Sequence, residues 1–218
     1  MANVNIVSRF CFFAIALSSP SVNAATPTSF ISNVSVGVAA RQDNIDWSIK
    51  GTTVNVLSEL KWKKLNTPQI HIATNLNLPK ALFLSLQMAG GDISSGSNED
   101  TDYNGNNRTL PFLRSESKGD GRLTDIEVTL GQSLSFLNNT LIIKPKIGFF
   151  RYNQNLTMSD GYQVIPNYGS IFGLNNSYDM QWQGVLLGVD VSKKITNNCL
   201  ISFGFEYGRA DYTAQANW

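Results

Sequence analysis

The segment Leu-Ile-Ser-Phe-Gly-Phe-Glu-Tyr, residues 200–207, alternates between two kinds of side chain. Every odd position from 201 to 207 carries a large apolar or aromatic residue, and the positions between them carry Ser, Gly or Glu. Side chains of a β-strand point alternately to the two faces of a sheet. A period of two therefore predicts a strand with one apolar and one polar face.

The same alternation recurs along the chain, at 53–63, 69–78 and 123–130, and no apolar stripe has helical spacing. This pattern predicts an all-β protein. Seven strands are expected, at roughly 30–41, 53–64, 69–90, 122–136, 141–158, 178–192 and 199–214.

The connections between these strands alternate in length. Short turns are expected at 65–68, 137–140 and 193–198, and long polar loops at 91–121 and 159–177. Outer-membrane barrels have short periplasmic turns and long extracellular loops. The fold class predicted is therefore an antiparallel, up-and-down transmembrane β-barrel.

A soluble, secreted barrel or sandwich is the alternative, because alternation does not say whether the apolar face points in or out. Two features favour the membrane barrel. The polar faces carry charges such as Glu59, Lys61, Asp125 and Glu206, which would be costly in a dry core. The strands also reach the ~9–11 residues that a tilted membrane strand needs.

The first 24 residues have the features of a secretory signal peptide. Arg9 precedes the apolar run Phe10–Leu17, and small residues lead to a cleavage site near Ala24. Eight apolar residues are too few for a membrane-spanning helix, which takes about 20. The predicted organisation is a signal peptide at 1–24 and a barrel domain at 25–218, located in the bacterial outer membrane.

Composition excludes several functions. The 218 residues carry a formal net charge of +1, which argues against a nucleic-acid partner recruited by bulk charge. No phosphate-binding loop, serine-nucleophile elbow or paired-histidine metal motif is present, so no cofactor and no metal are predicted. The expected partners are outer-membrane lipid, including lipopolysaccharide, and protein or peptide ligands at the extracellular loops.

Several motifs together resemble the omptins, a family of outer-membrane aspartate proteases with ten-stranded barrels. They occur in order across most of the chain after residue 24. The motifs are Asn44-Ile45-Asp46-Trp47, Leu60–Leu65 with Pro68-Gln69-Ile70, Asp100-Thr101-Asp102-Tyr103, and the strand segments Trp182–Val191 and Ile201–Tyr207.

The resemblance implies a protease site in which two aspartates face an Asp-x-His pair across a cleft, with the histidine activating water. Asp100 and Asp102 are the candidate catalytic half-site, with Tyr103 where the family prefers Trp. The Asp-x-His half is missing, since residues 208–218 contain no histidine. His71, the only histidine, is expected in the lumen near the turn at 65–68, too far from Asp100 to serve as its base.

An acidic cluster and a set of basic residues each allow more than one interpretation. The run Asn98–Asp102 is either part of the protease-like site, a calcium-binding cluster or a solvated loop. Basic residues that follow it are expected either to contact lipopolysaccharide phosphates or only to keep the loop soluble; they are Arg108, Arg114, Lys118 and Arg122.

Seven strands is an odd number, although bacterial single-chain barrels have even numbers. The count is off by one, the chain lacks strands of a ten-stranded protein, or copies pair edge to edge; missing strands are the preferred explanation. The function predicted is a surface barrel without protease activity as written. The alternatives are an omptin-type endopeptidase, if the chain is incomplete, and a small porin-like channel.

Overall fold

The computed structural model describes residues 3–5, 31–196 and 199–217, and they form a single antiparallel sheet. Seven strands are long: β2 (Ile31–Ile49), β3 (Ser58–Asn77), β4 (Leu82–Asp92), β6 (Thr109–Gln132), β8 (Leu141–Ile165), β10 (Asn176–Thr196) and β11 (Cys199–Asn217). β5 (Ser95–Gly105) is as long as β4 and continues it after a short break. Shorter elements are β1 (Asn3–Asn5), β7 (Leu134–Phe136), β9 (Gly169–Ile171) and the 3-10 turn η1 (Asn106–Arg108). Over these ranges, no helix is long and apolar enough to cross a membrane.

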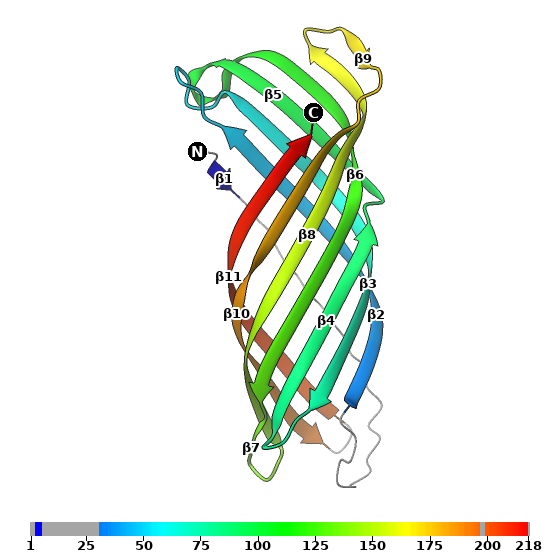
Figure 1. The fold of residues 1–218 in the computed structure, drawn as a ribbon, viewed down its shortest axis with the longest axis vertical. Coiled ribbons are helices and arrows are strands. Elements are labelled where there is room, and N and C mark those ends of the chain that lie inside the picture. The colour runs from blue at the N-terminus through cyan, green and yellow to red at the C-terminus, as the bar shows by residue number, and fades with distance from the viewer. Residues whose placement is uncertain (1–2, 6–30, 197–198, 218) are drawn as a thin grey trace.

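The strands follow one another around a curved sheet in the order β1-β2-β3-β4-β6-β8-β10-β11 (Figure 1). β5 continues upward from β4 and pairs with both β3 and β6, so that the two together act as one long strand. The short turn at 78–81 and the turn region at 133–140 lie at the lower end in Figure 1, which the rule of short periplasmic turns makes the periplasmic end.

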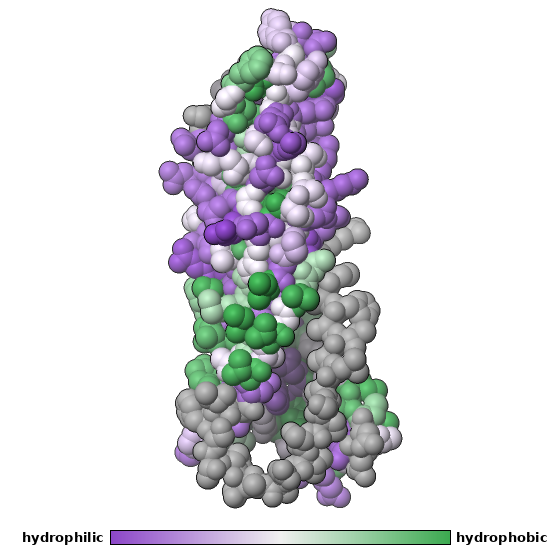
Figure 2. Space-filling model, turned by 90° about the vertical axis from the view of Figure 1, so that its right-hand side faces the viewer, coloured by the Kyte–Doolittle hydropathy of each residue, from purple (hydrophilic) through white to green (hydrophobic). Residues whose placement is uncertain are grey.

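Large apolar side chains cover the outside of the lower half. Each is 37–87% exposed: Val34, Val36, Val38, Ile70, Ile72, Leu86, Met88, Ile126, Val128, Leu130, Ile147, Phe149, Val185, Leu187, Phe203, Phe205 and Tyr207. Figure 2 shows apolar side chains gathered below a hydrophilic upper part. Such a band, which we call the lipid-facing band, belongs in hydrocarbon and not in water. The predicted class, an antiparallel all-β outer-membrane barrel, is confirmed.

Above the band the pattern inverts, because the apolar side chains turn inward. On β8, Ile147 and Phe149 point outward, whereas Leu156 and Met158 are buried inside. The inner residues of the upper half form one core: Ile45, Leu60, Trp62, Leu65, Ile93, Leu123, Leu156, Met158, Tyr178 and Met180. The upper half is thus built like a water-soluble barrel, and it rises beyond the membrane as a β-extension.

The predicted number of long strands is correct, but one turn was wrongly placed. Residues 65–68 were expected to be a turn, yet β3 runs through them, and the chain reverses at 78–81. Between Lys63 and Asn66 the ladder shifts at a bulge that buries Leu65 completely. Pro68 is tolerated because it lies between the end of the β5 ladder and the start of the β4 ladder, where no partner needs its missing N–H.

The two predicted long loops, 91–121 and 159–177, are also largely wrong, since β5, η1 and the upper parts of β6 and β8 occupy them. Backbone pairing continues there with polar outer side chains, because water replaces lipid outside. The predicted signal peptide falls almost wholly outside the described residues. Only β1 is described in that segment, and it pairs with β2 at Asp46–Ser48.

Candidate functional site

Asp100 and Asp102 lie on β5, on its inner face near the extracellular end. Asp100 is opposite Leu60 of β3, and Asp102 is opposite Ser58. Directly opposed residues share one face of a sheet, and Leu60 belongs to the buried core, so both carboxylates face the interior. The Ser58 hydroxyl lies 3.4 Å from Oδ1 of Asp100, to which it donates. The two candidate residues therefore lie on the same face of one strand.

The surroundings of Asp100 favour its neutral, protonated form. Burial, reinforced by the charge of Asp102, raises the pKa of Asp100 to about 6. Burial also raises the pKa of the Tyr178 phenol, and the charge of Asp100 acts in the same direction. A carboxyl that titrates near neutrality can exchange protons in catalysis, but a hydrolase also needs a second group that orients and activates water.

The histidine does not supply that group. His71 lies mid-way along β3, between Gly37 of β2 and Ala89 of β4. It faces the lumen as predicted, since its neighbours Ile70 and Ile72 point outward. Its expected place beside a periplasmic turn is wrong, because that turn lies at 78–81. Eleven residues of β3 separate His71 from Leu60, which is about 36 Å at ~3.3 Å per residue.

The calcium reading of Asn98–Asp102 finds no support from geometry. Alternation sends Asn98, Asp100 and Asp102 inward and the intervening residues to the other face, where Glu99 pairs with Lys63 at 3.2 Å. A single ion would need these oxygens to converge. Among the described residues, no three or more acidic, histidine or cysteine side chains form a group able to hold a metal ion.

The basic residues expected to contact lipid phosphates each have a carboxylate neighbour instead. Arg108 pairs with Glu59 at 2.8 Å, Lys118 with Asp160 at 2.5 Å and Arg122 with Asp92 at 2.7 Å. Arg114 is 3.9 Å from Glu116. These pairs join neighbouring segments of the extension, so their charges are already balanced within the protein.

Two contacts fasten η1 to the rest of the extracellular rim. Glu59 is 95% buried, and its carboxylate accepts hydrogen bonds from Arg108 and Lys61. Burial acts to raise the pKa of Glu59, but these two cations hold it below its ordinary value. Asn55 and Asn107 bind each other reciprocally, with the Asn107 amide N–H and the Asn55 side-chain amide donating at 2.7 Å each. The sequence offered no signal for this rim, since its parts lie about 50 residues apart.

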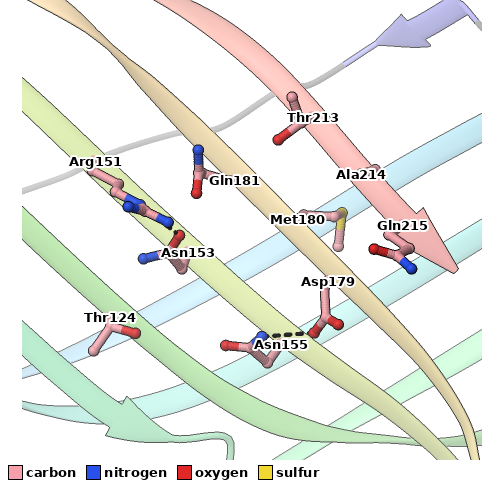
Figure 3. Close-up of a pocket in the computed structure, with 10 residues that line it drawn as sticks. All are labelled: Thr124, Arg151, Asn153, Asn155, Asp179, Met180, Gln181, Thr213, Ala214 and Gln215. Carbon is pink, nitrogen blue, oxygen red and sulfur yellow. Dashed lines mark hydrogen bonds between the residues drawn. The ribbon is translucent and has the colours of Figure 1, made fainter.

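A polar depression lies on the outer face, directly above the lipid-facing band (Figure 3). It encloses about 490 Å³ and is lined by residues of β6, β8, β10 and β11. Asn155 donates to Asp179 at 2.6 Å, and Arg151 reaches only its strand neighbour Asn153, at 3.4 Å. Arg209 is exposed nearby, opposite Val185. Sequence reasoning missed this surface, because four separate strands contribute to it.

Inside the band, paired charges line the lumen. Arg41 contacts Asp43 at 2.8 Å and Asp125 at 2.9 Å, and Lys146 lies between Asp190 and Glu206. A hollow of about 260 Å³ beside Lys144 and Lys146 remains open in this lower half. Each of these carboxylates thus has a cation partner in the lumen, which explains how the charges are tolerated inside a membrane protein.

A tall antiparallel sheet with apolar residues outside and paired charges inside defines an outer-membrane β-protein. The family model described as Pom, Protochlamydia outer membrane protein, matches residues 35–218, and the chain belongs to this family. The protein is accordingly located in the bacterial outer membrane. No curated protein matches the chain. The family match does not extend to the omptins, so that resemblance stays a prediction.

Proposed function

We propose that this protein is a surface barrel that neither cleaves peptides nor conducts, and that it holds a rigid β-extension above the outer membrane. The observation that carries the proposal is the apolar core of the extension. Leu65 and Leu123 are fully buried and Trp62 is 1% exposed, so side chains fill the interior where a channel would have to pass. A small barrel has an interior just wide enough for such filling.

Protease activity lacks a water-activating partner for Asp100 and Asp102. The one histidine of the chain is about 36 Å away along β3, at ~3.3 Å per residue. An endopeptidase remains the second candidate, because both carboxylates face inward at the extracellular end and burial raises the pKa of Asp100 to about 6. That activity requires an Asp-x-His pair from outside the described residues.

Outer-leaflet lipid is the partner we propose for the outer depression. Arg151 and Arg209 stand on the outer face at the upper border of the lipid-facing band, and within the described residues neither has a carboxylate partner. A guanidinium suits a phosphate group. The earlier candidates Arg108, Lys118 and Arg122 are replaced in this role, since carboxylates already neutralise them.

Conductance across a planar bilayer tests the function. The refolded protein should give no current steps. The double variant Leu65→Ala/Leu123→Ala, which removes packing from the core, should conduct, whereas Val185→Ala/Leu187→Ala on the outer face should not. Regular current steps from the unaltered protein would contradict a sealed lumen.

Peptide cleavage tests the second candidate separately. The protein should leave a fluorogenic dibasic peptide intact, at a rate equal to that of Asp102→Asn. Cleavage that this substitution abolishes would establish the endopeptidase instead.

A further inference from the structure

In the part of the chain that the structure describes, the two edges of the sheet have no neighbouring strand within the lipid-facing band. Among the described residues, β11 pairs only with β10, and β2 pairs only with β3 except where β1 meets it at Asp46–Ser48. Both edges cross the band, at Val34–Val38 on β2 and Phe203–Tyr207 on β11. Hydrocarbon offers no hydrogen-bond partners, so lipid does not tolerate open strand edges. In the membrane, something must pair with both.

The direction of the edges restricts what can pair with them. Six antiparallel junctions link the seven long strands, so β2 and β11 both run from the periplasmic to the extracellular end. Pairing β2 directly with β11 would create a parallel junction. The same holds for an edge of a second copy, because all copies share one orientation in the membrane. Bacterial outer-membrane barrels are antiparallel throughout.

Contacts across the lumen show that the gap is narrow. Arg41 of β2 reaches Asp125 of β6 at 2.9 Å, and the ring of Trp47 of β2 lies 6.0 Å from that of Tyr178 of β10. One copy therefore already curls around its own interior. A shared barrel of two copies would need a flatter sheet, in which these contacts could not form.

The charged side chains beside the gap also indicate that a further strand lies next to β11. Glu206 lies on β11 and Asp190 on β10, and their side chains are 38% and 37% exposed, against 7% for Lys146, which pairs with both. No described strand lies beyond β11 to shield Glu206 from lipid. Lys146 is thus shared by two acids, so a lumen-facing donor on a closing strand would complement them.

We propose that an odd number of further strands of the same polypeptide closes the gap between β11 and β2, the strands at both edges running toward the periplasm. An odd number makes every junction antiparallel and the total even. Supply from the same chain needs only a hairpin at the extracellular end of β11, which costs little loop entropy. A separate polypeptide would also lose translational and rotational freedom.

The intact mass of the protein, purified from outer membranes after expression from its native gene, is the first test. We expect the mature mass to exceed the mass of the printed chain counted from the observed N-terminus, near Ala25, to Trp218. The additional sequence should contain an odd number of amphipathic segments of about 9–11 residues each. A mass fully accounted for by residues up to Trp218 would overturn the proposal, as would an even number of such segments or a co-purifying second polypeptide that fills the gap.

Disulfide formation between the edges is the second test, in a Cys199→Ser background. Phe205→Cys is combined in turn with Val34→Cys, Val36→Cys and Val38→Cys, and oxidation should cross-link none of these pairs. The matched control, Leu187→Cys with Tyr207→Cys, joins residues that oppose each other on β10 and β11 and should cross-link. A cross-link between the edges, within one copy or between two, would overturn the proposal. The mass measurement needs no variant, so it still tests the proposal if one of the cysteine variants does not fold.

Discussion

Nη1 of Arg41 lies 2.9 Å from Oδ2 of Asp125, although the two residues are 84 positions apart and belong to strands that are not neighbours in the sheet. The same guanidinium contacts Asp43 of its own strand through Nε at 2.8 Å. One arginine thus pairs with two carboxylates from opposite walls of the lumen. This contact holds β2 close to β6, so it supports the curvature of the sheet.

Replacing that arginine should destabilise the protein strongly. Arg41→Met leaves Asp43 and Asp125 close together without a cation, and breaking a buried ion pair in this way typically costs about 3–5 kcal/mol. Urea unfolding in detergent micelles, followed by tryptophan fluorescence, measures the change. Arg151→Met on the outer face is the matched control and should cost less than about 1 kcal/mol. Similar losses for both variants would mean that the lumen pair contributes little.

The core of the extension should be as sensitive as that of a soluble protein. Leu156→Ala removes a side chain that is 1% exposed, and such substitutions cost about 2–5 kcal/mol. Leu187→Ala, on the lipid-facing band, leaves no internal cavity and should cost less. Equal effects in the same unfolding assay would show that the upper half is not packed as a dry core.

Asp100 should make the protein more stable at mildly acidic pH. Its pKa is raised to about 6 in the folded protein from 3.8, so the folded state binds the proton more tightly than the unfolded state does. The resulting penalty is fully present above pH 6 and disappears as the pH falls through 6 toward 3.8. Asp100→Asn should therefore stabilise by about 1–3 kcal/mol at pH 7.5 and have little effect at pH 4.

Unfolding midpoints of the two proteins at pH 4, 5, 6 and 7.5 test this dependence. Glu116→Gln, an exposed carboxylate on the extension, controls for a general loss of negative charge. A constant difference between Asp100→Asn and the unaltered protein across this range would contradict the prediction.

Glu59 should protect the extracellular turn η1 from proteolysis. Its carboxylate fastens Arg108 at 2.8 Å, so Glu59→Gln should speed tryptic cleavage after Arg108 by roughly tenfold, which corresponds to about 1.4 kcal/mol of lost local stability. Mass spectrometry of timed digests locates the cut. The pKa of Glu59 is held below its ordinary value, so the contribution of the ion pair is present at neutral pH and is lost only as the pH falls through that lowered pKa.

Cysteine labelling on intact cells should verify which end faces outward. Phe172 is 96% exposed between β9 and β10 at the upper end, and Phe172→Cys in a Cys199→Ser background should react with a membrane-impermeant maleimide. Native Cys199 is exposed at the opposite end and should react only after lysis. The reverse pattern would invert the orientation assigned from the turn lengths.

Alternation was enough to predict the strands, and the membrane location followed from adding the charges of the polar faces, the strand lengths and the alternation of short turns with long connections. It did not place the turn after β3, since the Thr-Pro pair at 67–68 has the composition of a turn but lies at a junction of two ladders. The sequence pattern also led to a prediction of long loops where the structure has the β-extension. The signal for the extension was present: on β8 the apolar residues change from odd positions at Ile147 and Phe149 to even positions at Leu156 and Met158.

The candidate site was predictable only as a list of residue types. Asp100 and Asp102 were predicted in a long loop, whereas they lie on β5, where residues two apart share one face of the strand. The ion pairs that neutralise Arg108, Lys118 and Arg122 were not predictable, since each partner lies 30 to 49 positions away and the pairing depends on strand register. The outer depression was not predictable either, because it depends on the register of four strands at once.

The exchange of apolar residues from the outer to the inner face, at about Arg151 on β8, also determines how deep the molecule sits in the membrane. Sinking by two residues, about 7 Å along a strand at ~3.3 Å per residue, would draw Arg151, Gln183 and Asp211 into hydrocarbon. Rising by the same distance would bring Phe149 and Val185 into water. The extension therefore stands at a constant height above the bilayer, and its rim is presented at a fixed distance from the cell surface.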